Sequence, residues 1–230
     1  MPFDYAVILP TYNEKASLER GAGNIRRMAA GIGRPYEIIV VDDDSPDGTG
    51  AEARRLGLRT IVRKNRRGLA SAILEGFRAA EAPNVFVMDA DGQHDLARFP
   101  QMVEILCSNR ADLVVASRYL KEGQMKMDPL RRAVSGGAAL IAKPLLGEIT
   151  DPMSGFFGVK KKPLMTVRRW SLIGFKLLPE IVVRCPGLRV AQVPLQFKER
   201  LGGESKMDGR EVLNYLHLSA RLYLARLGIG

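Results

Sequence analysis

The sequence predicts a single α/β domain in which helices cover both faces of a mostly parallel, Rossmann-like sheet. Two patterns predict this fold. Apolar runs of strand length alternate with stretches of helical pattern, which is typical of βα units. The strand runs are continuously apolar rather than alternating, as expected where a sheet is buried on both faces. With 230 residues, 46% of them hydrophobic, the chain is long enough to bury one such core.

The βα pattern is clearest in the first half of the chain. Strands are expected at Tyr5–Leu9, Glu37–Val41, Arg59–Val62, Val85–Met88 and Asp112–Ala116. Helices are expected at Ser17–Ala30, Gly50–Leu56, Leu69–Ala80 and Leu96–Cys107. In the less regular second half we expect a helix at Arg131–Leu146 interrupted by Pro144, a strand at Phe156–Val159, a helix at Phe175–Arg184 and a strand at Leu188–Phe197.

The end of the chain has a different composition. Glycines and charged residues fill Lys198–Gly209, which predicts a mobile loop that closes over ligands. A Leu- and Tyr-rich amphipathic helix is expected at Glu211–Leu227. We therefore expect one α/β domain over residues 1–208 and a C-terminal amphipathic helix over residues 209–230.

Two carboxylates follow the strand expected at Val85–Met88. Asp89 and Asp91 alternate along an extended backbone and so share one side of it, and Gln93 continues the alternation. Ligands bind at the carboxyl ends of strands in open α/β sheets. Hard oxygen ligands there suit Mg²⁺ or Mn²⁺ holding a diphosphate. An Asp-x-Asp triplet alone is also common in solvated loops, so the metal site depends on further support.

A second acidic cluster supplies that support. Asp42, Asp43 and Asp44 follow the strand expected at Glu37–Val41. Three adjacent carboxylates repel one another and are costly to bury without a cation or hydrogen-bond donors. Part of the cluster can instead begin the next helix, because Ser45 and Asp47 are good N-cap residues. Two strands with acidic ends make a joint functional role the favoured interpretation.

The first strand ends in Pro10-Thr11-Tyr12-Asn13-Glu14 at the same predicted edge. Tyr12 could stack on a base, and Glu14 could accept hydrogen bonds from a base or a ribose. The alternative is a proline turn in which Asn13 or Glu14 begins the next helix.

The formal charge of +10 implies anionic partners, which include nucleic acid, phosphorylated substrates and anionic membranes. Neither an aromatic-interleaved basic motif nor zinc-finger spacing supports nucleic acid, so we expect none as a partner. Cys107 and Cys185 lack metal-ligand spacing and are expected to be buried free thiols in a reducing compartment. The sequence contains neither a signal peptide pattern at Met1–Tyr5 nor an apolar run of about 18 residues, which predicts a soluble or peripheral protein.

Several motifs occur together in one order along nearly the whole chain, from about Val7 to Lys206. They are Pro10–Glu14, Asp42–Thr49, the Lys64–Gly68 turn, Asp89–His94, Ser117–Tyr119, Asp151–Phe157, Gly174–Lys176 and Gly203–Lys206. In this the chain resembles the family 2 inverting glycosyltransferases of the dolichyl-phosphate mannose synthase group, which have a GT-A type fold. Gly92 is a departure, because many relatives carry a bulkier residue there.

The resemblance implies a site whose residues follow the matching motifs. Asp89, Asp91 and Gln93 would ligate Mg²⁺ or Mn²⁺, and Asp91, Arg118 and Arg131 would be catalytic, with Arg118, Arg131 and Ser135 receiving the lipid phosphate. The substrate-binding residues would be Pro10, Tyr12, Glu14, Val41, Asp42, Asp44, Asp89, Ala90, Asp91, Ser135, Lys176, Arg200 and Lys206. From spacing alone, Arg118 and Arg131 could equally be ordinary surface arginines. His94 and His217 need no catalytic role.

The implied reaction transfers mannose from GDP-mannose to dolichyl or another polyprenyl phosphate with inversion, giving a β-linked product. A phosphate monoester has a second pKa of about 6 and is already an anion at neutral pH, so a dedicated general base is not needed. Arginine, lysine and metal must instead gather two anionic substrates. UDP-glucose as donor is the nearest alternative, and a non-catalytic membrane-surface protein that binds nucleotide or lipid phosphate is an alternative of another class.

The implied acceptor lies in a bilayer. Arg131–Leu146 and Glu211–Leu227 each combine arginines with apolar residues and could lie at the membrane interface, or could pack on the sheet instead. Relatives either carry C-terminal membrane helices or dock onto small membrane-anchoring subunits. The expected location is peripheral, on the cytoplasmic face of the plasma membrane in a prokaryote or of the endoplasmic reticulum in a eukaryote.

Overall fold

A computed structural model describes residues 2–90, 96–120, 144–172, 177–195, 217 and 220–224. The strands are β1 (Tyr5–Thr11), β2 (Tyr36–Asp42), β3 (Arg59–Val62), β4 (Asn84–Val87), β5 (Leu113–Ser117), β6 (Phe157–Lys160) and β7 (Val190–Pro194). The helices are α1 (Lys15–Ile32), α2 (Thr49–Arg55), α3 (Leu69–Ala79), the 3₁₀ turn η1 (Leu96–Arg98), α4 (Phe99–Cys107), α6 (Lys161–Leu164) and α7 (Leu177–Arg184). The observed order confirms the predicted βα alternation.

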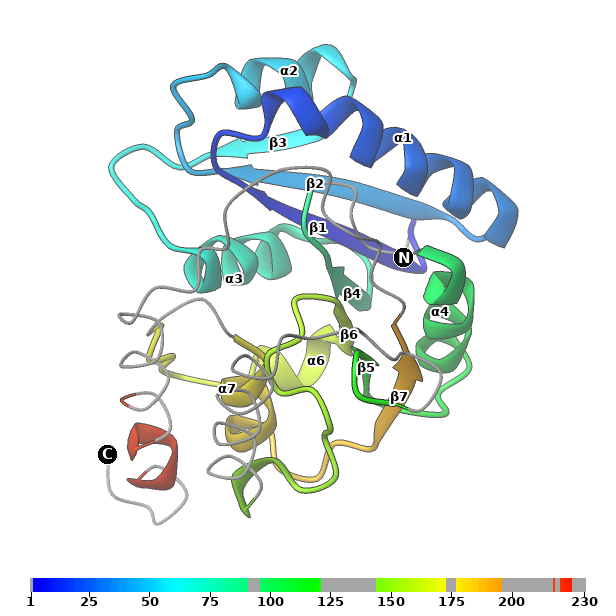
Figure 1. Ribbon diagram of the computed structural model, residues 1–230, viewed down its shortest axis with the longest axis vertical. Coiled ribbons are helices and arrows are strands. Elements are labelled where there is room, and N and C mark those ends of the chain that lie inside the picture. The colour runs from blue at the N-terminus through cyan, green and yellow to red at the C-terminus, as the bar shows by residue number, and fades with distance from the viewer. Residues whose placement is uncertain are drawn as a thin grey trace.

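The strands form one seven-stranded sheet in the order β3-β2-β1-β4-β6-β5-β7 (Figure 1). Strand β6 is antiparallel to both of its neighbours, β4 and β5, and the other described strands all run in one direction. The prediction of a mostly parallel sheet is therefore confirmed. The reversal of β6 places its first residue at the edge where the other strands end, so the loop before β6 reaches the carboxyl edge of the sheet.

Two apolar layers bury the sheet, one on each face. Helices α1, α2 and α4 contribute Leu18, Ala53 and Phe99 to one layer. Helices α3, α6 and α7 contribute to the other, with Phe77, Leu164 and Ile181 among their buried side chains (Figure 1). Since side chains alternate along a strand, neighbouring residues such as Val7 and Ile8 of β1 lie in opposite layers. Burial on both faces explains why these strands are continuously apolar.

Most predicted elements are present with shifted ends. Strand β3 has the predicted bounds, β1 and β2 extend to Thr11 and Asp42, and the predicted helix at Leu96–Cys107 begins as the 3₁₀ turn η1. The four-residue helix α6 is not predicted by the sequence pattern. The predicted helix 131–146, loop 198–209 and final helix lie largely outside the described residues. Of the final helix, His217 and residues 220–224 are helical, His217 is exposed and Leu222 is buried in the layer that contains α7.

Both cysteines are free, as predicted. Cys185 is buried, and burial raises its pKa to about 11, whereas Cys107 is only half-buried. Among the described residues, none of the helices combines the length and apolar character required to cross a bilayer.

The hydroxyl group of Tyr5 is buried and has no hydrogen-bond partner. Its ring lies among Tyr36, Phe86 and Phe99, with centroid distances of 5.8, 5.9 and 5.8 Å. Because an unpaired buried hydroxyl costs free energy and the ring supplies the packing, Tyr5→Phe should raise the free energy of unfolding by about 1 kcal/mol. Urea denaturation measures the change, and a lower midpoint for the variant would contradict the unpaired state of the hydroxyl.

Candidate active site

The ends of several strands and the loop before β6 meet at the carboxyl edge of the sheet. Residues 10–14 end or follow β1, Asp42 ends β2, and residues 43 and 44 follow it. Asp89 and Ala90 follow β4, and Arg118 follows β5. The parallel register pairs Thr11 of β1 with Asp42 of β2. The structure thus brings together the described residues of the predicted site, at the edge where α/β sheets bind ligands.

Asp42 is buried and its carboxylate accepts hydrogen bonds from within the protein. Thr11 Oγ1 donates to Asp42 Oδ1 at 3.0 Å, the Ser45 hydroxyl donates to the same oxygen, and Ser45 N donates to Oδ2 at 3.0 Å. A Cβ atom at Gly50 would lie 3.0 Å from Asp42 Oδ2, so this close approach favours glycine. Asp42 therefore fixes the turn after β2, and its oxygens do not form a vacant cation site.

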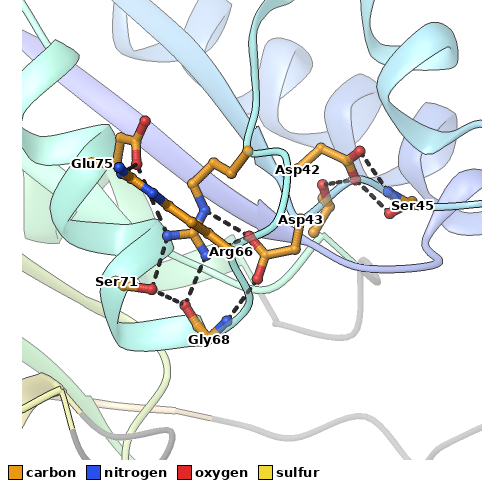
Figure 2. Close-up of polar contacts among 9 residues, drawn as sticks. Asp42, Asp43, Ser45, Arg66, Gly68, Ser71 and Glu75 are labelled. Carbon is orange, nitrogen blue, oxygen red and sulfur yellow. Dashed lines mark hydrogen bonds and ion pairs between the residues drawn. The ribbon is translucent and has the colours of Figure 1, made fainter.

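Figure 2 shows the Asp43 side chain directed toward Gly68 and away from Ser45, the partner of Asp42. Asp43 forms a buried ion pair with Arg63. Arg63 Nε donates to Asp43 Oδ1 at 2.7 Å, and Gly68 N donates to Oδ2 at 2.8 Å. Arg63 also donates hydrogen bonds from Nη1 to Ser71 Oγ at 2.8 Å and from Nη2 to the Gly68 carbonyl oxygen at 3.1 Å. Gly68 has φ +139°, a conformation that requires glycine. The pair thus holds the Lys64–Gly68 turn against the edge of the sheet.

The exposed surface of this turn lies beside the end of β1. The Arg67 guanidinium lies 4.5 Å from the centroid of the Tyr12 ring, a cation–π distance, and Tyr12 is partly exposed. Asp44 is also exposed, with φ +55°, and none of the described residues donates a hydrogen bond to its carboxylate. An aromatic face, a guanidinium and a carboxylate are therefore available to a ligand here.

Hydrogen bonds connect the turn after β1 to the loop after β2. The backbone N–H groups of Asn13, Glu14 and Lys15 donate to Ser45 Oγ, Thr49 Oγ1 and Asp47 Oδ2, at 3.0, 2.9 and 3.1 Å. Desolvation raises the pKa of Asp47, but hydrogen bonds from Thr49 and Lys15 outweigh it and leave the pKa lowered. The N-cap residue of α2 is Gly48, without a side-chain cap hydrogen bond, so the expectation that Ser45 or Asp47 would be this N-cap is wrong. Asp47 instead accepts hydrogen bonds from the first N–H groups of α1 and α2, at Lys15 and Thr49.

Glu14 has a local role in addition to its predicted contact with a base or ribose. Ser17 Oγ donates to Glu14 Oε2 at 2.6 Å, and the Ser17 and Leu18 N–H groups donate to the Glu14 carbonyl. The carboxylate therefore lies at the beginning of α1. Pro10 and Val41 are buried neighbours across β1 and β2, so they shape the floor of this region.

Asp89 is exposed at the end of β4, and Ala90 beside it is buried. A Cβ atom at Gly155, in the loop before β6, would lie 3.3 Å from Asp89 Oδ2 and 3.7 Å from Oδ1. The absence of a side chain at Gly155 thus leaves space beside the Asp89 oxygens. The other two predicted metal ligands, Asp91 and Gln93, lie outside the described residues, as do Arg131, Ser135, Lys176, Arg200 and Lys206.

Arg118 pairs with the fully buried Asp151 of the loop before β6. Arg118 Nε and Nη2 donate to Asp151 Oδ2 and Oδ1 at 2.7 and 2.8 Å, and Arg118 N donates to Oδ2 at 3.2 Å. Desolvation lowers the pKa of Arg118, but the hydrogen bonds and the charge of Asp151 raise it further, so the guanidinium stays charged. Ser154 Oγ donates to the Ala116 carbonyl at 2.7 Å and ties the same loop to β5.

Sequence reasoning did not assign site roles to Arg67, Arg63 or Asp151. The signal that points to Arg67 is the basic run Lys64-Asn65-Arg66-Arg67, which follows β3 at the ligand edge. Arg63 gives no such signal, because it acts through Asp43. Asp151 lies in the motif Asp151–Phe157, but only the fold shows that it pairs with Arg118.

Comparison with known proteins agrees with this arrangement. Residues 6–168 match the family described as glycosyl transferase family 2. The chain is similar to dolichol-phosphate mannosyltransferases of Pyrococcus furiosus (39% identity, 94% of this chain), Saccharomyces cerevisiae (35%, 99%) and Mycosarcoma maydis (35%, 97%). It spans 63% of the Pyrococcus protein, 90% of the yeast protein and 80% of the Mycosarcoma protein.

Solved structures share the fold at lower identity. Glucosyl-3-phosphoglycerate synthase of M. tuberculosis superposes with a TM-score of 0.69 at 22% identity, covering 99% of this chain and 82% of that one. A second structure of that enzyme, in complex with Mn²⁺, UDP and glucosyl-3-phosphoglycerate, gives a TM-score of 0.66 at 22% identity over 99% of this chain and 81% of that one. The fold is thus of the GT-A type. The chain belongs to glycosyl transferase family 2 and, within it, to the dolichol-phosphate mannosyltransferase group.

Proposed function

We propose that this protein transfers mannose from GDP-mannose to dolichyl or another polyprenyl phosphate, with inversion at the anomeric carbon. The observation that carries the proposal is the gathering of Tyr12, Asp44, Asp89 and Arg118 at one sheet edge in a chain of this family. The names of the relatives support a dolichol-phosphate acceptor. The donor and the stereochemistry rest on the resemblance of the motifs.

The nucleoside is expected beside Tyr12. The ring is partly exposed and Arg67 lies over it, so a base can stack here on an aromatic or a guanidinium face. Asp44 and Glu14 offer carboxylate oxygens to the base or ribose, and Pro10 and Val41 form the buried floor. Asp42 contributes by holding this edge in place, since its own oxygens are engaged by Thr11 and Ser45.

A divalent cation fits the end of β4 better than the end of β2. Asp89 is exposed at the end of β4, beside Gly155, which has no side chain, whereas Asp42 and Asp43 are buried. Asp89 would hold Mg²⁺ or Mn²⁺ together with Asp91 and Gln93, and Ala90 would line the diphosphate between the two carboxylates. When bound, the cation offsets the charge that develops on the departing GDP.

Arg118 is well suited to receive the acceptor phosphate. Asp151 holds its guanidinium in a fixed plane at the end of β5, and a fixed guanidinium binds phosphate with little loss of entropy. The phosphate oxygen would attack the anomeric carbon as the bond from that carbon to the GDP oxygen breaks, so the product is inverted. No proton leaves the nucleophile, so the proposed step does not require a general base. Arg131, Ser135, Lys176, Arg200 and Lys206 are proposed to complete the phosphate and sugar contacts.

We propose that the protein acts at the cytoplasmic face of a membrane as a peripheral protein, since its acceptor is a membrane lipid. Small membrane-anchoring subunits would be partners, the membrane would be the plasma membrane of a prokaryote or the endoplasmic reticulum of a eukaryote, and nucleic acid would not be a partner.

Nucleotide protection tests the donor site. In the presence of Mn²⁺, GDP should raise the thermal unfolding midpoint of the protein more than UDP does, because bound ligand stabilises the folded state by mass action. EDTA should reduce the protection. Stronger protection by UDP would indicate a UDP-sugar donor in the same type of reaction. A lack of protection by both nucleotides would contradict the proposed nucleoside site.

A further inference from the structure

A basic and apolar surface lies between the two predicted membrane segments in the sequence. Between β6 and α7, residues 161–172 carry four cations, namely Lys161, Lys162, Arg168 and Arg169, and no carboxylate. Lys161 Nζ is held by the carbonyl groups of Arg78 and Ala80. The side chains of Lys162, Arg168 and Arg169 are exposed, and none of them has an ion-pair partner among the described residues. We call residues 161–172 the basic–apolar segment.

Apolar side chains of this segment point both inward and outward. Leu164 is buried, and Val167 and Trp170 are partly buried against the layer that contains α7. Met165 and Leu172 are instead 56% and 45% exposed. Large exposed apolar side chains interleaved with unpaired cations have no favourable interaction with water, which indicates an interaction surface. Figure 1 draws the segment in yellow-green and yellow between β6 and α7.

The end of the segment is anchored to α7. Glu180 is 1% exposed, and its carboxylate accepts hydrogen bonds from the backbone N–H groups of Ser171 and Leu172. Arg184 donates from Nε to Glu180 Oε1 at 2.6 Å and from Nη2 to Ser171 Oγ at 2.9 Å. Because these contacts fix the backbone beside Trp170, the exposed side chains belong to a surface that is formed before any partner binds.

We propose that the basic–apolar segment docks onto an anionic phospholipid bilayer. Lys162, Arg168 and Arg169 would lie at the phosphate groups, while Met165 and Leu172 enter the boundary with the acyl chains. Trp170 has the amphipathic ring that is enriched at this boundary. A nucleic acid would use the cations but would leave Met165 and Leu172 in water, so the combination favours a membrane.

The course of the chain brings one end of this surface toward the sheet edge that carries the candidate site. Lys161 N bonds to the Pro83 carbonyl before β4, at the amino edge of the sheet. Helix α7 leads back to β7, which begins at that same edge, so Leu172 before α7 lies toward the carboxyl edge. Docking would therefore hold the candidate site near the bilayer. The proposal depends on the proposed function only for this purpose, because vesicle binding does not require transfer.

The chain contains one tryptophan, Trp170, so its fluorescence reports on this surface alone. Vesicles of phosphatidylcholine with phosphatidylglycerol should shift the emission to shorter wavelength, brominated acyl chains should quench it, and phosphatidylcholine alone should do neither. The double variant Arg168→Gln/Arg169→Gln should bind about 25-fold more weakly, from a loss of about fivefold per cation. A matched control, Arg20→Gln/Arg54→Gln, removes two exposed charges from α1 and α2 on the other face of the sheet and should bind as the parent does.

Four outcomes would overturn the proposal: no binding to anionic vesicles, binding without quenching of Trp170, equal weakening by both double variants, or unaltered vesicle binding by Arg168→Gln/Arg169→Gln. Transfer to a detergent-dispersed acceptor separates the two claims. Retained transfer with unaltered vesicle binding in Arg168→Gln/Arg169→Gln would reject the surface and keep the function, and circular dichroism confirms that each variant is folded.

Discussion

Asp89→Asn should lower metal-dependent sugar transfer by at least about 100-fold, because it removes a charged ligand worth several kcal/mol of stabilisation to the departing diphosphate. The substitution keeps the size of the side chain, so the space beside Gly155 is preserved. Circular dichroism checks that the variant is folded. Initial rates at several Mn²⁺ concentrations measure the effect. Alanine at Asp91 should abolish the same metal-dependent turnover.

The matched control is Asp112→Asn, which removes one carboxylate from the opposite edge of the same sheet. Asp112 pairs with Lys160 and Arg189, both at 2.8 Å, and lies before β5 rather than after it. This variant should retain the parent rate. Full activity of Asp89→Asn across the Mn²⁺ range would reject the cation site at the end of β4.

The largest effect on stability is expected at the pair of Asp43 and Arg63. The Asp43→Ala variant leaves the Arg63 guanidinium buried without its carboxylate, which should cost about 3–5 kcal/mol of the free energy of unfolding. The Gly68 N–H loses its acceptor in the same variant. Replacing both partners by apolar residues, as in Asp43→Leu/Arg63→Met, should cost clearly less than the sum of the two single changes.

Urea denaturation of the single and double variants completes the cycle. Glu19→Ala is the comparison for an exposed ion pair, because the Glu19 side chain is 70% exposed and its Oε1 lies 3.6 Å from Arg55 Nη2. An exposed pair contributes about 0–1 kcal/mol, so Glu19→Ala should change stability little. Equal losses in Asp43→Ala and Glu19→Ala would show that the buried pair does not hold the turn.

The position of the acidic cluster could be predicted from the sequence, but the separate roles of its three aspartates could not. The strand pattern predicts that Asp42, Asp43 and Asp44 lie at the ligand edge, and the structure places them there. The sequence cannot divide their roles, because the partners of Asp43 come from residues 63 and 68, which only the fold brings close. Repulsion within the cluster is relieved by protein donors to Asp42 and Asp43 and by the exposure of Asp44.

The positions of the strands could likewise be predicted, but the direction of one of them could not. Apolar runs locate the strands, and the intervening helices predict that most are parallel. The direction of β6 does not follow from a four-residue apolar run, since a strand pattern carries no orientation. Its reversal brings Asp151 and Gly155 to the site, beside Arg118 and Asp89. The short helix α6 lacks enough residues to show a helical period, which explains why it was not predicted.

The central claim is metal-dependent transfer of mannose to a polyprenyl phosphate. The most direct measurement supplies the protein with dolichyl phosphate in detergent and Mn²⁺ or Mg²⁺, with labelled GDP-mannose and labelled UDP-glucose in parallel reactions. Label should enter the organic-extractable lipid from GDP-mannose only, and EDTA should prevent it. Label from UDP-glucose alone would contradict the donor, and transfer that persists in EDTA would contradict the metal site.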